Sequence, residues 1–315
     1  MIYLVWVPLL VPFLAGPAGR RLVSCVPPRQ AAWLLTLTTA GLAAGSTASL
    51  ALLVIPGATH VHAVAALGDL LTPLTTGSPD TVVAMGTVAA ALLAWCTTVL
   101  VRGLHRRRAQ LRRARRLAAC ADGELVVLKD DSPDAYALPG RPGRIVVTTG
   151  MLRALSAAER EALFAHERAH LSGRHHLFVA VAELAALCHP GLRSLREPLG
   201  YALERSADEA AAEAVGDRRL AARAIGRAAL ATRAAQSPGA GRPGFAMAAT
   251  TGPVPRRVAA LLDHGAHGAH PRRTTNRFLA AALLACLALS AASALEAATD
   301  LHTSIEIAQG ESPRD

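Results

Sequence analysis

The sequence predicts a mainly α-helical membrane protein with about four transmembrane helices and one cytosolic α+β domain. Three observations lead to this fold class. Just over half of the 315 residues are hydrophobic (52%), yet the formal net charge is +10, so apolar and basic residues must occupy different segments. Long apolar runs alternate with arginine-rich segments, which is typical of a chain that crosses a bilayer several times. A short motif of two histidines and a glutamate between the third and fourth apolar runs indicates a metal site there.

Four apolar runs are expected to enter the membrane, at about 2–15, 31–55, 81–101 and 278–295. The last three are long enough to cross a hydrocarbon core of about 30 Å as helices. The first is shorter, contains two prolines and resembles the apolar part of a signal peptide, but no basic residue precedes it. Residues 1–101 are therefore interpreted as an N-terminal membrane region with three spans.

The arginines predict the orientation of the four runs. Basic residues concentrate in the cytoplasmic loops of membrane proteins, and every loop of this chain fits one alternating path. The loop at 56–80 has neither Lys nor Arg, whereas eight arginines follow the third run between residues 102 and 116. We therefore expect a multi-pass protein of the cell membrane, with residues 102–277 in the cytoplasm and a short extracytoplasmic tail at 296–315. Smaller basic groups complete the pattern at Arg20, Arg21, Arg29, Arg272, Arg273 and Arg277.

The basic segment at 102–117 is expected to fix the topology and to contact anionic headgroups of the lipid bilayer. Nucleic-acid binding is the alternative for such a run. No aromatic residue interleaves it, so no direct contact with nucleic acid is expected. The five cysteines are scattered and form no C-x-x-C pair, which fits a reducing compartment and indicates neither disulfides nor a cysteine zinc site.

The cytosolic domain (118–277) is expected to begin with a small antiparallel sheet. Strands are predicted at 124–129, 136–138 and 144–149, because apolar or β-branched runs are separated there by Asp, Pro and Gly residues typical of turns. A free edge of such a sheet can bind an extended peptide by strand addition. The edge strand assigned to substrate binding consists of Arg144, Ile145, Val146, Val147 and Thr148.

The helix after the sheet contains the motif H-E-x-x-H. Ser156 and Glu159 form a capping-box pattern at its start, and apolar residues follow at helical spacing. Residues four apart share one face of a helix, so His166 and His170 can offer two imidazole nitrogens to one metal ion. Glu167 can then reach a water at the metal and remove its proton. The alternative is a chance match on a helix with a satisfied pair of histidines.

A second helix, at 200–215, offers the third ligand that a two-histidine zinc site requires. Glu204 and Asp208 are four apart and share a face. Glu204 is the favoured ligand, and Asp208 is expected to accept the remaining N–H of a ligand histidine. Asp208 or Glu213 as the ligand are the alternatives, as is an acidic face that only contacts solvent.

The rest of the domain gives weaker signals. A stretch rich in Gly, Pro, Ser and Thr at about 236–255 predicts a mobile loop, and a short helix is expected at 256–263. His175 and His176 are interpreted as surface or structural residues rather than as ligands. The apolar segment 177–187 is interpreted as a core helix or as a surface that lies on the membrane.

An H-E-x-x-H helix followed by E-x-x-x-D on a second helix resembles the integral-membrane gluzincins, the M48 and M56 metallopeptidases. The entry into the first helix, IVVTTGMLRALSAAEREALFAHERAHL, is most similar to the M56 group, whose best-known members are the BlaR and MecR antibiotic-sensing receptors. The resemblance implies a cytosolic domain of the zincin type. It also implies Zn²⁺ ligands at His166, His170 and Glu204, with Glu167 as the catalytic glutamate.

One departure from the M56 receptors narrows the expected function. Their extracellular penicillin-binding domain uses an S-x-x-K motif, but the only lysine here, Lys129, has Val126 three residues before it. Direct acylation by a β-lactam is therefore excluded as a trigger. We expect a membrane-anchored zinc endopeptidase that cleaves a cytosolic protein in a signalling pathway, such as a repressor of the BlaI or MecI type. The alternatives are an M48-like quality-control protease for membrane proteins and a non-catalytic signalling scaffold with a vestigial site.

Overall fold

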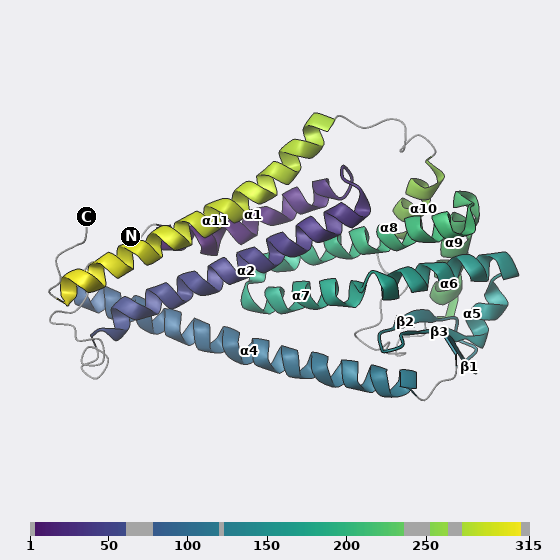
Figure 1. Ribbon diagram of the computed structural model, residues 1–315, viewed down its shortest axis with the longest axis horizontal. Coiled ribbons are helices and arrows are strands. Elements are labelled where there is room, and N and C mark those ends of the chain that lie inside the picture. Colours follow the sequence, from purple (N-terminus) through teal and green to yellow (C-terminus); the bar gives the residue numbers. More distant parts are fainter. Residues whose placement is uncertain (1–3, 61–77, 120–122, 236–252, 264–272, 310–315) are drawn as a thin grey trace.

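The computed structural model of the chain describes residues 4–60, 78–119, 123–235, 253–263 and 273–309. Most of these residues are helical. Long helices lie along the long axis of the molecule, and a lobe of shorter helices with a small sheet lies at one end (Figure 1). Residues 236–252 of the predicted mobile loop lie outside the described residues. Residues 254 and 255, at the end of the predicted loop, are the first two residues of helix α10 (Val254–Leu262).

Four helices form the bundle: α1 (Val7–Leu22), α2 (Pro28–Ala58), α4 (Pro79–Ala119) and α11 (Arg273–Ala308). Among the described residues, three of these helices are candidate membrane spans, because each contains an 18-residue stretch of sufficient hydropathy within Pro28–Ala58, Pro79–Arg116 or Ala280–Ile307. Helix α1 follows a short 3₁₀ turn, η1 (Leu4–Trp6), and has only 16 residues.

The bounds of the bundle helices differ from the predicted spans in three places. Helix α1 begins after residue 2 and continues beyond residue 15. Pro8 lies in its first turn, where a proline costs no intrahelical bond, and Pro12 and Pro17 lie inside the helix. The predicted third span and the basic segment after it form the single helix α4. Helix α11 continues beyond residue 295, so the predicted tail is helical as far as Ala308.

The sheet has three strands, β1 (Leu125–Leu128), β2 (Ala135–Leu138) and β3 (Arg144–Thr148). The prediction of an antiparallel sheet is wrong in part, because β1 pairs parallel to β3 and only β2 pairs antiparallel to it. The strand order is β1-β3-β2, so the assignment of β3 as the substrate-binding edge strand is also wrong. The β-branched residues of β3 are buried on both faces, as expected for a central strand. The two edges of the sheet are β1 and β2.

The sheet lies between two layers of helix. One face, with Ala135, Ile145 and Val147, packs in a core with residues of helices α5 (Thr149–Ala154), α6 (Ala157–Ser172) and α9 (Arg218–Ala235). The opposite face, with Leu138 and Val146, packs against Ala114 of α4. The basic C-terminal part of α4 is therefore one wall of the lobe, which explains why it continues as a helix beyond the apolar stretch.

A helical hairpin joins the lobe to the bundle. It consists of α7 (His175–Cys188), the 3₁₀ helix η2 (Pro190–Leu195) and α8 (Arg196–Val215). Its apolar residues share one core with α1, α2 and α11. At its tip, Nε2 of His189 lies 2.9 Å from the carbonyl oxygen of Leu9 in α1. The apolar segment 177–187 is thus a core helix, and the predicted boundary between membrane region and cytosolic domain does not separate two cores.

Candidate active site

Helix α6 holds the first part of the site, and local sequence fixes where it begins. The Ser156 hydroxyl accepts from the amide of Glu159, and the Glu159 carboxylate accepts from the amide of Ser156, so the predicted capping box is present. One side of the helix is buried, and on it Nε2 of His166 and Nε2 of His170 lie 3.1 Å apart. Two imidazole nitrogens that converge this closely need a shared proton or a cation between them.

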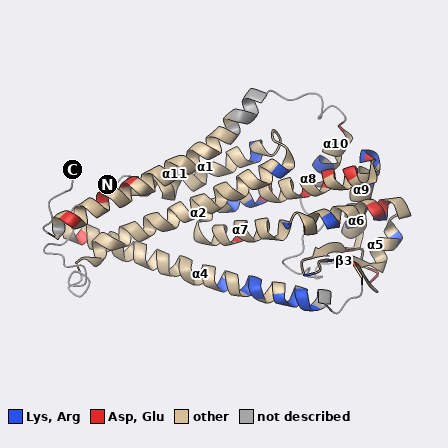
Figure 2. Cartoon of the chain, in the orientation of Figure 1, with Lys and Arg blue, Asp and Glu red and all other residues tan. Residues whose placement is uncertain are grey.

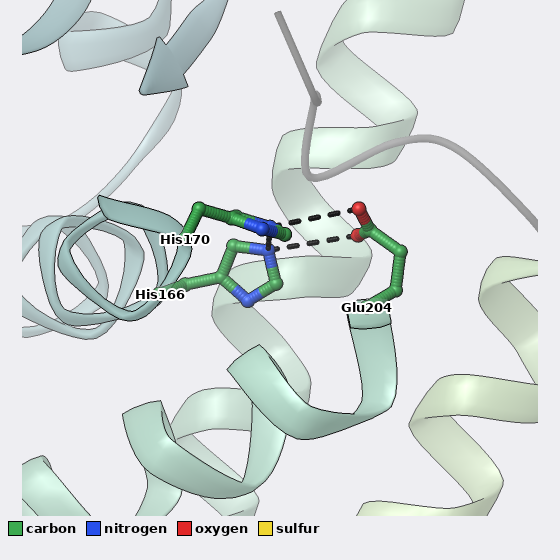
Figure 3. Close-up of side chains that lie close together, drawn as sticks. All are labelled: His166, His170 and Glu204. Carbon is green, nitrogen blue, oxygen red and sulfur yellow. Dashed lines mark hydrogen bonds and ion pairs between the residues drawn. The ribbon is translucent and has the colours of Figure 1, made fainter. Parts of the chain in front are cut away.

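Helix α8 supplies the third group. The two carboxylate oxygens of Glu204 lie 3.6 Å from Nε2 of His166 and 3.5 Å from Nε2 of His170 (Figure 3). Donor atoms bound tetrahedrally at about 2.0–2.1 Å from one ion lie about 3.3 Å apart, so this spacing fits a metal ion. The three side chains are buried and form a candidate metal site. Glu213 is exposed, and Asp208 contacts the far side of His166.

The far side of His166 is held by buried charges. Nδ1 of His166 lies 3.1 Å from Oδ1 of Asp208, the position expected for a residue that orients a ligand histidine. Arg257 of α10 donates to both oxygens of Asp208 at 2.8 and 2.5 Å, and lies 2.8 Å from Glu204. Burial alone would raise the pKa of Asp208, but its bonds to Arg257 and His166 lower it to about 2.

The charges of the site also fit a divalent cation. Glu167, Glu204, Asp208 and Arg257 are all at most 1% exposed. Three carboxylates and one guanidinium leave a formal charge of −2, which a divalent cation would neutralise. Without an ion, protons bound to these side chains offset the negative charge. Burial raises the pKa of Glu167 to about 7, while Asp208 and Glu204 outweigh the effect of burial on His166 and raise its pKa to about 9.

The far side of His170 is held by a neutral group. Nδ1 of His170 lies 2.8 Å from Nδ1 of His175, at the start of α7. Burial, followed by the positive charge of His166, lowers the pKa of His175 to about 4, so the ring stays uncharged near neutral pH. With Nε2 of His170 directed at a metal ion, the ring proton would be on Nδ1, which would donate a hydrogen bond to Nδ1 of His175. The chain reaches this position through Arg174 in the left-handed conformation (φ 50°) and through Gly173, where a Cβ would collide with the His175 ring.

The free edge of β2 lies beside Glu167. Ile145 donates its N–H to Glu124 on the β1 side, so its antiparallel partner Ala137 directs its own N–H and C=O away from β3. The Ala137 amide is close enough to Glu167 to act against the rise in its pKa. Within the described segments, neither carboxylate oxygen of Glu167 makes a hydrogen bond of standard geometry. Both groups are buried in this structure and lie at the edge along which a peptide would be placed.

Two supporting residues of the site were not predicted in that role: Arg257 was not singled out, and His175 was interpreted only as a surface or structural residue. Arg257 lies at helical spacing with Val254, Val258 and Leu261, and this periodicity places it on the buried face of α10. An arginine in that position signals a buried carboxylate partner. His175 offers no comparable signal, because only the turn at Gly173 and Arg174 brings its ring back to His170.

The fold and the site together define a class: a helical chain with membrane-spanning candidates and a metal site of two histidines and a glutamate beside a second, buried glutamate. A family model for peptidase family M48 matches residues 103–190, which are 88 of the 315 residues. The match includes His166, Glu167 and His170, and supports a metallopeptidase related to M48. Neither a curated protein nor a solved structure matches the chain. The narrower resemblance to the M56 group stays a prediction.

Proposed function

We propose that the chain is a membrane-anchored zinc endopeptidase. The observation that supports this function best is the convergence of His166, His170 and Glu204 next to Glu167 and the free edge of β2. Metal ligands alone would serve a structural site. A buried carboxylate beside them, with a strand edge that can hold an extended peptide, adds the parts that peptide hydrolysis requires.

The ligands His166, His170 and Glu204 would hold a Zn²⁺ ion, whose charge would make water more acidic and the scissile carbonyl more electrophilic. Glu167 takes the proton from the attacking water and returns it to the leaving amine. In the metal-free protein, burial raises the pKa of Glu167 to about 7, so this carboxylate is a stronger base than an exposed glutamate, as a group that accepts a proton requires. Asp208 and His175 keep the two imidazoles oriented, and the free edge of β2 aligns the substrate.

We propose that this site faces the cytoplasm of a cell whose membrane the bundle crosses. Basic residues gather on the parts of α1, α2 and α4 nearest the lobe, and acidic residues gather at the opposite end of the bundle (Figure 2). Because positive charge is retained on the cytoplasmic side, this distribution favours a cytoplasmic lobe. Cysteine scanning with a membrane-impermeant thiol reagent on intact cells tests the topology, with Ser24→Cys and Ser78→Cys on opposite sides expected to differ.

The catalytic proposal is tested with the full-length protein in lipid nanodiscs. Glu167→Gln should abolish cleavage of an unfolded protein such as casein while bound zinc stays at about one ion per chain. Glu161→Gln is the matched control, since Glu161 is an exposed residue of the same helix. His166→Ala should lose the zinc. Equal cleavage by wild type and Glu167→Gln would contradict the mechanism, and unchanged zinc in His166→Ala would contradict the site.

Two substrate classes remain candidates. The M56-like features favour one cytosolic protein, such as a transcriptional repressor. The M48 match and the hairpin packed into the bundle favour membrane proteins. Proteomics of a Glu167→Gln strain distinguishes them: one accumulating DNA-binding repressor supports signalling, whereas many accumulating membrane proteins support quality control.

A further inference from the structure

Five arginines form an exposed basic surface on the lobe. Four lie near the end of α4 and one lies in the turn between α6 and α7, and all five are exposed. In the described part of the chain, none of them pairs with a carboxylate. Unpaired like charges repel, so such a group indicates an anionic partner. We call these residues the basic cluster: Arg112, Arg113, Arg115, Arg116 and Arg174.

With the bundle crossing the membrane as proposed above, the bilayer is too distant to be that partner. Arg102 is the first charged residue after the apolar part of α4, and Arg115 lies about 20 Å further along the same helix at 1.5 Å per residue. The headgroup layer adds only about 5–8 Å to each side of the hydrocarbon core, and solvent screens exposed charges beyond about 8 Å. Arg102 and Arg106 can meet headgroups, whereas the basic cluster stands beyond them.

Packing places the basic cluster at one end of the free edge of β2. Ala114, between Arg113 and Arg115, is buried against Leu138, the last residue of β2. The guanidinium groups of Arg174 and Arg115 also lie close enough to His176 to contribute to the lowering of its pKa, after burial and Arg107. The cluster therefore lies next to the junction where β2 ends and α7 begins.

The direction of β2 tells which part of a substrate reaches this junction. Antiparallel pairing is the more stable way to add a strand, and a peptide antiparallel to β2 has its N-terminal side at Leu138. Glu167 lies by Ala137, so the scissile bond is placed near that residue. At about 3.3 Å per residue, the cluster is reached by positions about two to six residues before the scissile bond.

We propose, on the basis of the endopeptidase function above, that the basic cluster selects protein substrates with acidic residues on the N-terminal side of the scissile bond. Exposed charge pairs act weakly one by one, but several arginines acting together on two or more carboxylates give a measurable preference. The preference appears mainly in KM, because the cluster contacts the substrate away from the reacting bond.

The test uses full-length protein in nanodiscs of neutral lipid and quenched fluorescent decapeptides with either Glu-Glu or Gln-Gln upstream of the scissile bond. Wild type should cleave the acidic peptide with a kcat/KM about tenfold higher, and high salt should reduce this ratio. The variant Arg112→Glu/Arg115→Glu should lose the preference and should favour an Arg-Arg peptide instead. Arg219→Glu, an exposed residue of α9, is the control and should behave as wild type.

Each outcome bears on one proposal. Cleavage of acidic and neutral peptides at equal rates, or a preference that survives the double charge reversal, overturns the role of the basic cluster. A double reversal that lowers cleavage of all peptides equally, and only in nanodiscs with anionic lipid, assigns the cluster to the membrane and also overturns it. Failure of wild type to cleave any peptide or casein would instead contradict the endopeptidase function.

Discussion

The two imidazoles of the candidate metal site are supported by different chemistry on their far sides. Behind His166 lies a buried ionic group, Asp208 with Arg257, whereas behind His170 lies the neutral ring of His175. Removal of one partner from a buried ion pair leaves an uncompensated charge and costs about 3–5 kcal/mol, while a neutral hydrogen bond contributes about 0.5–1.5 kcal/mol. The two sides should therefore respond very differently to mutation and to pH.

The largest effect is expected from Arg257→Met. This change removes the buried guanidinium that pairs with both Asp208 and Glu204, so the metal-free protein should lose about 3–5 kcal/mol of stability. Thermal unfolding in detergent micelles measures the loss. Arg256→Met is the matched control, because Arg256 is exposed and lies over the Tyr201 ring, a contact of about 0.5–1 kcal/mol. Equal losses in the two variants would contradict the importance of the ionic side.

The ionic side should also make the stability of the metal-free protein depend on pH. Folding raises the pKa of His166 from 6.5 to about 9 and that of Glu167 from 4.5 to about 7. The pKa values of His170 and His175 are lowered instead, so below about pH 6.5 the protonation of these rings in the unfolded state opposes this trend. Above about pH 6.5 the folded state holds more protons than the unfolded state, and stability falls as pH rises to about 9. For His166 the change is on the order of 3 kcal/mol.

Thermal unfolding at pH 6 and pH 9 measures this dependence after removal of metal by a chelator. Zinc should reverse the trend, because the ion competes with protons for the same ligands. A Tm of the metal-free protein that increases from pH 6 to pH 9 would contradict the assigned protonation.

A smaller effect is expected when the ionic partner is neutralised without loss of volume. Asp208→Asn keeps the shape of the side chain but removes the charge that orients His166 and increases its basicity. Zinc affinity should fall about 10–100-fold, a typical result for a residue that orients a metal ligand. Competition with a chromogenic chelator measures it. An unchanged affinity would show that Arg257, rather than His166, is the main partner of Asp208.

The smallest effect is expected on the neutral side. His175→Phe removes the acceptor for Nδ1 of His170 while filling most of the space, and should lower zinc affinity by up to about tenfold. His175→Asn retains an acceptor and should recover much of the loss, which a purely structural role would not produce. A loss in His175→Phe as large as that in Asp208→Asn would remove the contrast between the two sides.

Some features of the site could be predicted because they depend on local spacing. The capping box at Ser156 and the shared face of His166 and His170 follow from helix geometry alone. The roles of Glu204 and Asp208 could also be predicted in part. The two residues are one helical turn apart, so one carboxylate can face the metal site while the other orients a ligand histidine. The sheet was predicted less well, because its strands are short and local sequence does not specify which of them lies in the middle.

The sequence by itself determined the apolar spans, the basic segment and the H-E-x-x-H helix, because each follows from composition or from periodicity along one element. Only the tertiary structure decided that β3 is central, that Arg257 and His175 support the two imidazoles, and that the α7–α8 hairpin shares a core with the bundle. These features join residues distant in the chain. Their energies come from burial and from the pairing of charges in a medium of low dielectric constant, which depend on position in space rather than on local sequence.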